Sequence, residues 1–177
     1  MAQLRRAIES GENESPEALL NRLNIHALVR DAQNTGLKSG SIDFFVSTTV
    51  LEYIPTEALK GIFAESRRLA SPNAVMSHYI DLYDQFSAFD RSITPFNFLR
   101  YSTNRWKWLR SPLIPLNRLR ISDYRALHAP AGFAIVKEVN TSGSAQDLEK
   151  IPLAAEFQEY SPADLLVVSS WLVSRAV

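Results

Sequence analysis

The pattern of apolar and polar positions predicts a strand, a helix and a second strand in the first half of the chain. Residues 42–46 are apolar almost throughout, which is typical of a strand covered on both faces, as in a parallel sheet. Residues 56–70 carry apolar side chains at helical spacing on one side and charged side chains on the rest, and residues 74–81 form the next strand. These lengths predict a right-handed crossover unit whose two strands are parallel neighbours, with the helix on one face.

Weaker patterns predict the remaining elements. Ser15 and Pro16 suit the start of a short helix, since serine caps free amides and proline is tolerated at the first helical position. Residues 24–30 form a modest strand candidate that ends at Asp31, and residues 122–127 form a capped helix. Two closing strands are predicted at residues 133–139 and 165–173.

Composition narrows the class of protein. The 177 residues are 46% hydrophobic, which fits one globular domain, and nineteen basic residues balance nineteen acidic ones, unlike a nucleic-acid-binding surface. The absence of cysteine excludes disulfides, zinc–thiolate sites and a cysteine nucleophile. No apolar run approaches the roughly 20 residues that span a bilayer, and the charged start resembles no secretory signal, so a cytoplasmic protein is expected.

Residues 41–55, read as Ser-Ile-Asp-Phe-Phe-Val-Ser followed by Thr-Thr-Val-Leu-Glu-Tyr-Ile-Pro, are the first of three segments whose order along the chain is informative. They resemble a strand and turn in the middle of the fold of class I S-adenosylmethionine-dependent methyltransferases of the type 11 kind. Residues 65–74 resemble its Glu-x-x-Arg segment, with Asn73 and Ala74 where two glycines are usual. The two closing strands resemble the last two of its sheet, the final one being antiparallel.

The resemblance implies an α/β fold, a partial Rossmann-like sheet within a three-layer α/β/α arrangement. The family order of strands is 3-2-1-4-5-7-6, and this chain matches it from about residue 24 to residue 173, so the first two strands are expected to be absent. Residues 1–177 are then a single, truncated methyltransferase-like domain, its carboxyl-terminal portion. An unpaired apolar edge at residues 42–46 favours self-association.

Cofactor contacts are implied at two places. Asp31 and Ala32 resemble the pair that contacts the adenine amine of S-adenosylmethionine, although Asp31 also suits a solvated strand end. Ser47, Thr48 and Thr49 follow a strand at the carboxyl edge, where they face the cofactor or the substrate, or merely cap the turn. The glycine-rich turn that admits the methionine part and ribose is missing, so weak binding by this chain alone is expected.

Substrate contacts are expected in a basic, aromatic lid at about residues 82–127. Residues 91–122 contain no acid, and Asn117, Arg118 and Arg120 are the candidate substrate residues, with the two arginines expected to be exposed. These residues suit an anionic or carrier-linked acceptor, or a membrane surface. Binding of nucleic acid is not expected, because the sequence contains no motif that supports it. The alternative is that the aromatic rings are core and the cations neutralise nearby acids.

Candidate chemistry is sparse, as methyl transfer from a sulfonium depends mainly on placement. His78 and Asp81 are weak candidates for a general base, and no metal site is expected because the spacing of His78, Asp81 and Asp84 matches no standard site. Two hypotheses follow. The chain is a methyltransferase, as part of a longer enzyme acting on a small or carrier-linked acceptor, or it is a non-catalytic remnant that serves as a binding or assembly module.

Overall fold

The computed structural model describes residues 15–109 and 115–177, which divide into two units at Asp31 and Ala32. In the first unit, helix α2 (Pro16–Arg22) begins as predicted, with Ser15 Oγ accepting a hydrogen bond from the Ala18 amide at 3.3 Å. The strand predicted at residues 24–30 is wrong, because this segment is irregular and pairs with no strand of the described sheet. An extended segment becomes a strand only when a neighbour satisfies its backbone groups.

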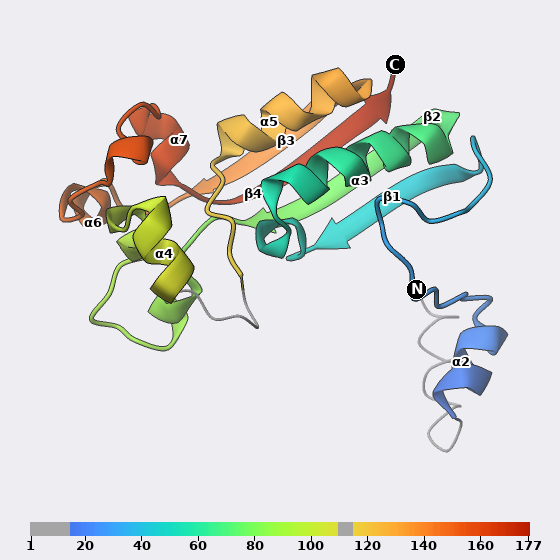
Figure 1. Cartoon of the computed structure of the whole chain (residues 1–177), viewed down its shortest axis with the longest axis horizontal. Helices are drawn as coiled ribbons and strands as arrows, with labels where there is room; N and C mark the ends of the chain where they lie inside the picture. Colours follow the sequence, from blue (N-terminus) through green and yellow to red (C-terminus); the bar gives the residue numbers. More distant parts are fainter. Residues whose placement is uncertain (1–14, 110–114) are drawn as a thin grey trace. The chain divides into compact units, whose positions relative to one another are not determined.

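The second unit contains a four-stranded sheet in the order β1-β2-β4-β3 (Figure 1). Strands β1 and β2 are parallel neighbours, while β4 is antiparallel to both β2 and β3. This confirms the predicted crossover unit and the partial Rossmann-like α/β sheet, including the antiparallel final strand. The strands are β1 (Ile42–Thr48), β2 (Ala70–Asp81), β3 (Phe133–Ser142) and β4 (Val167–Ala176).

Helices α3 (Thr56–Leu69) and α5 (Ile121–His128) cover one face of this sheet (Figure 1). Leu59 and Phe63 of α3 pack with Tyr124 of α5, and with Met76 and Leu172 from the two central strands. Alternate residues of a strand point to opposite faces, so these contacts fix which face of each strand is the core.

The other helical segments of the second unit are short. The α-helices are α4 (Thr103–Leu109), α6 (Ala145–Glu149) and α7 (Pro162–Leu166). The 3-10 turns are η1 (Leu51–Tyr53), η2 (Gln85–Ala88), η3 (Asn97–Arg100), η4 (Ala129–Ala131) and η5 (Ala155–Phe157).

The opposite face of the sheet carries exposed apolar side chains. Phe44 and Val46 of β1 are 68% and 70% exposed, and Trp171 of β4 is 53% exposed. Large apolar side chains clustered on one side of a sheet are unusual on a free protein surface. The expectation of an unpaired apolar edge at β1 is therefore confirmed for the described part of the chain, in which β1 pairs only with β2.

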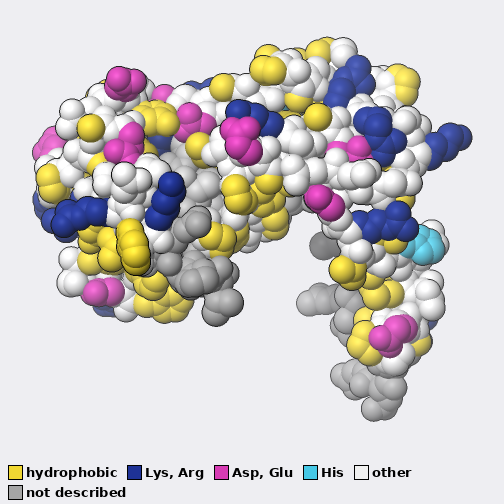
Figure 2. Space-filling model, in the orientation of Figure 1, with side chains coloured by type: hydrophobic (Ala, Val, Ile, Leu, Met, Phe, Trp, Pro, Cys, Tyr) yellow, Lys and Arg dark blue, Asp and Glu magenta, His cyan; other side chains and the backbone are white. Residues whose placement is uncertain are grey.

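A second, smaller hydrophobic cluster lies beyond the carboxyl ends of β1 and β2. It joins the residues around α4 to those of η5 and α7, and its buried members include Phe96, Phe98, Trp106 and Phe157. The rings of Phe96, Phe98 and Trp106 in the predicted lid are thus core, in agreement with the alternative interpretation, whereas those of Phe89 and Trp108 are 90% and 91% exposed. On the face shown in Figure 2, acidic and basic side chains are interspersed, as the zero net charge of the sequence predicts.

Candidate functional site

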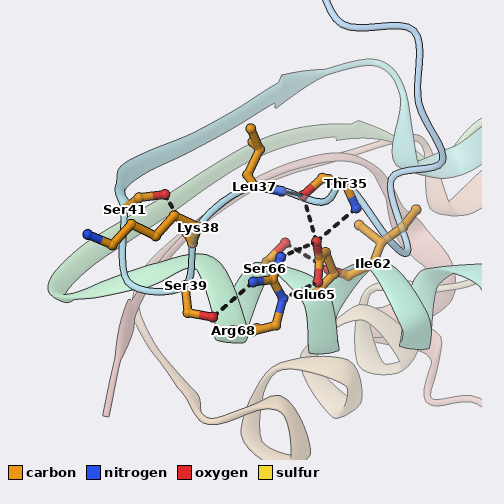
Figure 3. A network of polar contacts seen from close by, with 9 residues as sticks. All are labelled: Thr35, Leu37, Lys38, Ser39, Ser41, Ile62, Glu65, Ser66 and Arg68. Carbon is orange, nitrogen blue, oxygen red and sulfur yellow. Dashed lines mark hydrogen bonds and ion pairs between the residues drawn. The ribbon is translucent and has the colours of Figure 1, made fainter.

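A charged clamp fixes the loop that leads into β1. The carboxylate of Glu65 on α3 accepts bonds from the Thr35 amide at 2.9 Å and the Thr35 hydroxyl at 2.6 Å (Figure 3). Arg68 donates two bonds to the same carboxylate and a third to the Ser39 hydroxyl at 2.9 Å. These partners, Arg68 first, lower the pKa of Glu65 to about 2. The Glu-x-x-Arg segment therefore holds the loop that begins at Ala32 against α3.

We expect Glu65→Gln to loosen this loop while leaving the sheet intact, because the amide retains the shape of the carboxylate but loses the charged bonds to Arg68. Hydrogen exchange should accelerate at residues 35–41 and remain unchanged in β4. The ionised Glu65 stabilises the fold above its ordinary pKa near 4.5, so this contribution is lost as the pH falls toward about 2. Unchanged exchange in the loop of the variant would contradict the clamp.

The turn at the carboxyl end of β1 has an unusual backbone. Thr49 has a φ of 51°, in the left-handed region that non-glycine residues seldom occupy, and its amide donates to the Tyr79 carbonyl at 2.9 Å. Such strained conformations persist only where the surroundings fix them, and they are frequent at functional sites. Thr48 and Thr49 are both exposed at this edge. Their hydroxyls are therefore accessible to a ligand.

Asn117 fixes the next part of the same turn. Its side-chain amide donates to the carbonyls of Leu51 and Ile54, at 2.9 and 2.8 Å, and its backbone amide donates to the Glu52 carbonyl at 2.8 Å. The Asn117 oxygen in turn accepts a bond from the Tyr124 hydroxyl. With these groups engaged, Asn117 acts by positioning η1 at the end of β1.

Glu52, in the centre of η1, is the most unusual residue of this region. Its side chain is 2% exposed, and neither carboxylate oxygen has a hydrogen-bond partner of normal geometry among the described residues. Burial is the main reason that the pKa of Glu52 rises to about 7; the neighbouring Asp81 raises it further, while the backbone amides of Glu52 and Asp81 partly oppose the change. An unpaired buried carboxyl is costly, so its retention points to a role other than stability.

Asp81 ends β2 beside Glu52, and three tyrosines complete the group. Burial raises the pKa of Asp81. Burial also raises the pKa of Tyr83, as do the nearby acidic groups of Asp81, Tyr53, Tyr79 and Glu52. We call these five residues, Glu52, Tyr53, Tyr79, Asp81 and Tyr83, the acidic edge. It lies where the parallel strands β1 and β2 end, the position at which open α/β sheets bind ligands.

His78 lies on the covered face of β2, away from the acidic edge. Its Nδ1 is 2.7 Å from the Ser47 hydroxyl, and its ring, which is 6% exposed, lies near the rings of Phe63 and His128. Burial, reinforced by His128, lowers the pKa of His78 to about 4, so the imidazole is neutral at pH 7. The Ser47 hydroxyl is therefore engaged by the buried imidazole, and of the two candidate bases only Asp81 is partly exposed to solvent.

The expectation that Arg118 and Arg120 are exposed is wrong. Arg118 is 6% exposed, stacks between the rings of Trp106 and Phe157, and donates to the carbonyls of Phe98 and Tyr101. Arg120 is fully buried, and burial lowers its pKa to about 10. A guanidinium has five donors in a fixed fork, which suits it to gather carbonyls from several loops. The sequence shows that these side chains are charged, but it does not show which backbone carbonyls accept their hydrogen bonds.

The two remaining candidates, Asp31 and Ala32, are neighbours in the sequence. Asp31 ends the first unit and Ala32 begins the second, where the loop fastened by Glu65 starts. Glu52 and Tyr83 were missed by the sequence analysis, although an acid inside the otherwise apolar turn of residues 50–54 was a signal for Glu52. In the described ranges, no three histidine, aspartate or glutamate side chains could together hold a metal ion. Nor does any helix described there have the length and apolarity to cross a bilayer.

Several solved structures with a similar fold are described as methyltransferases. A protein from Pyrococcus horikoshii OT3 has a TM-score of 0.58 at 14% identity, over 98% of this chain and 66% of its own. A methyltransferase from Methanosarcina mazei, described as dependent on S-adenosylmethionine, scores 0.51 at 13% identity over 85% and 66%. Geranyl diphosphate C-methyltransferase from Streptomyces coelicolor, solved with Mg²⁺, geranyl diphosphate and S-adenosyl-L-homocysteine, scores 0.56 at 10% identity over 90% and 56%.

The chain thus spans between about half and two thirds of the length of these three neighbours. No curated protein matches it significantly in sequence. Residues 3–77 match the profile of the family described as methyltransferase domain, a range that includes β1, η1, α3 and most of β2. The chain has the fold of the class I S-adenosylmethionine-dependent methyltransferases, and its residues 3–77 are similar in sequence to the methyltransferase domain.

Proposed function

We propose that this chain takes part in methyl transfer from S-adenosylmethionine to a small-molecule acceptor, at the carboxyl edge of β1 and β2. The observation that carries the proposal is the match of residues 3–77 to the methyltransferase domain, because it includes β1, the η1 turn with Glu52, and β2 as far as Ser77. The small-molecule acceptor of the geranyl diphosphate enzyme supports an acceptor of that size here.

The exposed hydroxyls of Thr48 and Thr49 fit the methionine part of the donor, and Asp31 remains the candidate for the adenine amine. The donor supplies an activated methyl group on a sulfonium. Asn117 then contributes by holding η1, so that the acidic edge keeps its geometry while donor and acceptor meet. The donor thus supplies the activated methyl group, and the protein positions the donor and the acceptor. This is typical of a reaction in which the positioning of the reactants, rather than a nucleophilic side chain, provides most of the acceleration.

A second candidate function is a non-catalytic binding or assembly module. The exposed Phe44, Val46 and Trp171, together with the unpaired edge of β1 in the described residues, favour it. A partner that covers this face would bury apolar area and satisfy the edge of β1. A second copy of the chain is one such partner, and a membrane surface or a carrier-linked acceptor near the exposed Trp108 remains a further proposal.

Calorimetric titration with S-adenosylmethionine tests the first function. We expect binding by the 177-residue chain to be weaker than micromolar, because none of the glycines with positive φ in the described part follows a strand of the sheet and opens a helix. Any measured binding should weaken in Thr49→Val, which removes only the exposed hydroxyl. Sedimentation of the chain alone tests the second function, and a monomer that binds the donor and transfers labelled methyl would exclude it.

A further inference from the structure

The acidic edge combines two carboxyl groups with three phenols and has no counter-ion among the described residues. None of the ion pairs formed by these residues involves Glu52 or Asp81. Glu65 is paired with Arg68, and the buried Asp84, which also has no ion pair there, accepts hydrogen bonds from the Phe86 amide and the Asn97 side chain. The buried Glu52 carboxylate has neither kind of partner with normal geometry. Placing two acids side by side without a cation is unfavourable unless one is protonated or a cation arrives from outside.

The placement of each group indicates what such a cation would touch. Asp81 and the rings of Tyr53, Tyr79 and Tyr83 are half-buried, so each presents part of its surface to solvent. Glu52 lies behind them with its oxygens enclosed, near the backbone amide of Asp81. Phenol rings attract ammonium groups through their π faces, and a carboxylate beside them adds a charge of the complementary sign.

We propose that the acidic edge binds a cationic nitrogen, and that the methyl acceptor is an amine. The second clause rests on the proposed methyl transfer, whereas the first stands on the cluster alone. An ammonium would lie against Asp81 and the tyrosine rings, with the buried Glu52 carboxyl behind them adding negative potential.

The reaction balances without a further reagent. The bound ammonium gives a proton to the Asp81 carboxylate, and the freed nitrogen lone pair forms the bond to the methyl carbon of the sulfonium donor. The carbon–sulfur bond breaks with its electron pair remaining on sulfur, which leaves a neutral thioether. The methylated nitrogen carries the positive charge.

Binding of a cation should strengthen with pH. In the described part of the chain, the titratable groups that interact with Glu52 are Asp81 on β2, Tyr83 after it, and Tyr124 on α5, and all three are acids. At about pH 5 Glu52 is protonated, and above about pH 7 it is ionised. A permanently charged ligand therefore encounters one more negative charge at the higher pH.

The probe is choline, compared with the neutral alcohol in which a tert-butyl group replaces its trimethylammonium group. The two have nearly the same shape and differ in charge. In nuclear magnetic resonance titrations of the full chain at about pH 8, we expect choline to shift the amide signals of Tyr53 and Tyr83, and to bind at least about tenfold more tightly than the alcohol. Choline affinity should fall by about tenfold in Asp81→Asn, and also on lowering the pH to about 5.

Glu52→Gln is the second variant, since it keeps the size of the side chain and should abolish the pH dependence. Glu149→Gln, which removes an exposed carboxylate on α6, is the matched control and should leave both probes unaffected. Equal binding of choline and its neutral counterpart, no binding of either, or an effect of Glu149→Gln equal to that of Asp81→Asn would overturn the proposal. Choline binding without methyl transfer would sustain the cation site and contradict the proposed function instead.

Discussion

Replacing Arg120 with alanine should unfold most of the chain at room temperature. Arg120 Nη1 donates to the Leu82 carbonyl at 2.7 Å, and Nη2 donates to the carbonyls of Leu165 and Val167. Alanine would leave three buried acceptors without a donor, at about 1–3 kcal/mol each, and a cavity in place of the side chain. The total approaches the 5–15 kcal/mol that typically stabilises a domain.

Urea denaturation followed by circular dichroism measures this loss. The matched control is Arg105→Ala on α4, where the cation is exposed and the change should remain within about 0.5 kcal/mol. Equal midpoints for the two variants would show that Arg120 does not link β2, α7 and β4 as its hydrogen bonds indicate. Because Arg118 and Arg120 are buried, reversing the charge of these two candidate substrate residues would measure folding rather than substrate binding.

The parallel pairing of β1 with β2 followed from the pattern of the sequence, whereas the order and direction of β4 and β3 came from the resemblance to the methyltransferase family. The nearly continuous apolar run at residues 42–46 indicated a strand, and a crossover helix of that length leaves a parallel neighbour as the simple solution. The expectation that this strand is covered on both faces is wrong for the described residues, because Phe44 and Val46 are 68% and 70% exposed. The same reasoning failed at residues 24–30, where apolar side chains were present but strand pairing was not. The hydrophobic pattern shows which side chains can be buried, whereas a strand also needs a neighbouring strand that pairs with its backbone N–H and C=O groups.

The candidate site was less accessible to sequence reasoning. The sequence located three of the candidates by their positions at or after the ends of predicted strands, and the structure contains these strands. They are Thr48, Thr49 and Asp81. Glu52 was not, because a glutamate in a turn is ordinarily solvated, and only the packing of η1 under Asn117 encloses it. The charge composition also does not predict which cations are buried. An exposed arginine and one that donates to buried carbonyls, such as Arg120, cannot be distinguished in a basic segment of the sequence.

Replacing Glu52 with glutamine should stabilise the chain at about pH 8 and leave it unchanged at about pH 5. The folded state raises the pKa of Glu52 to about 7, so the native protein binds a proton more tightly than the unfolded chain, in which the pKa is near 4.5. A raised pKa favours folding at low pH, and this advantage is lost as the pH rises from about 4.5 to about 7. The difference corresponds to about 3 kcal/mol, since one pKa unit is about 1.4 kcal/mol.

Glutamine resembles the protonated acid, so the variant avoids this loss while leaving the amide as poorly paired as the neutral carboxyl. Thermal unfolding at the two pH values measures the effect, with Glu149→Gln as the control that should change neither midpoint. An equal shift at both pH values would mean that packing, rather than ionisation, accounts for the change.

His78 provides an internal contrast, because burial lowers its pKa to about 4 and its contribution to stability is instead lost as the pH falls below about 6.5. If Glu52→Gln gains stability above pH 7 and at the same time loses the pH dependence of choline binding, the cost of this buried carboxyl is explained by the cation that it attracts.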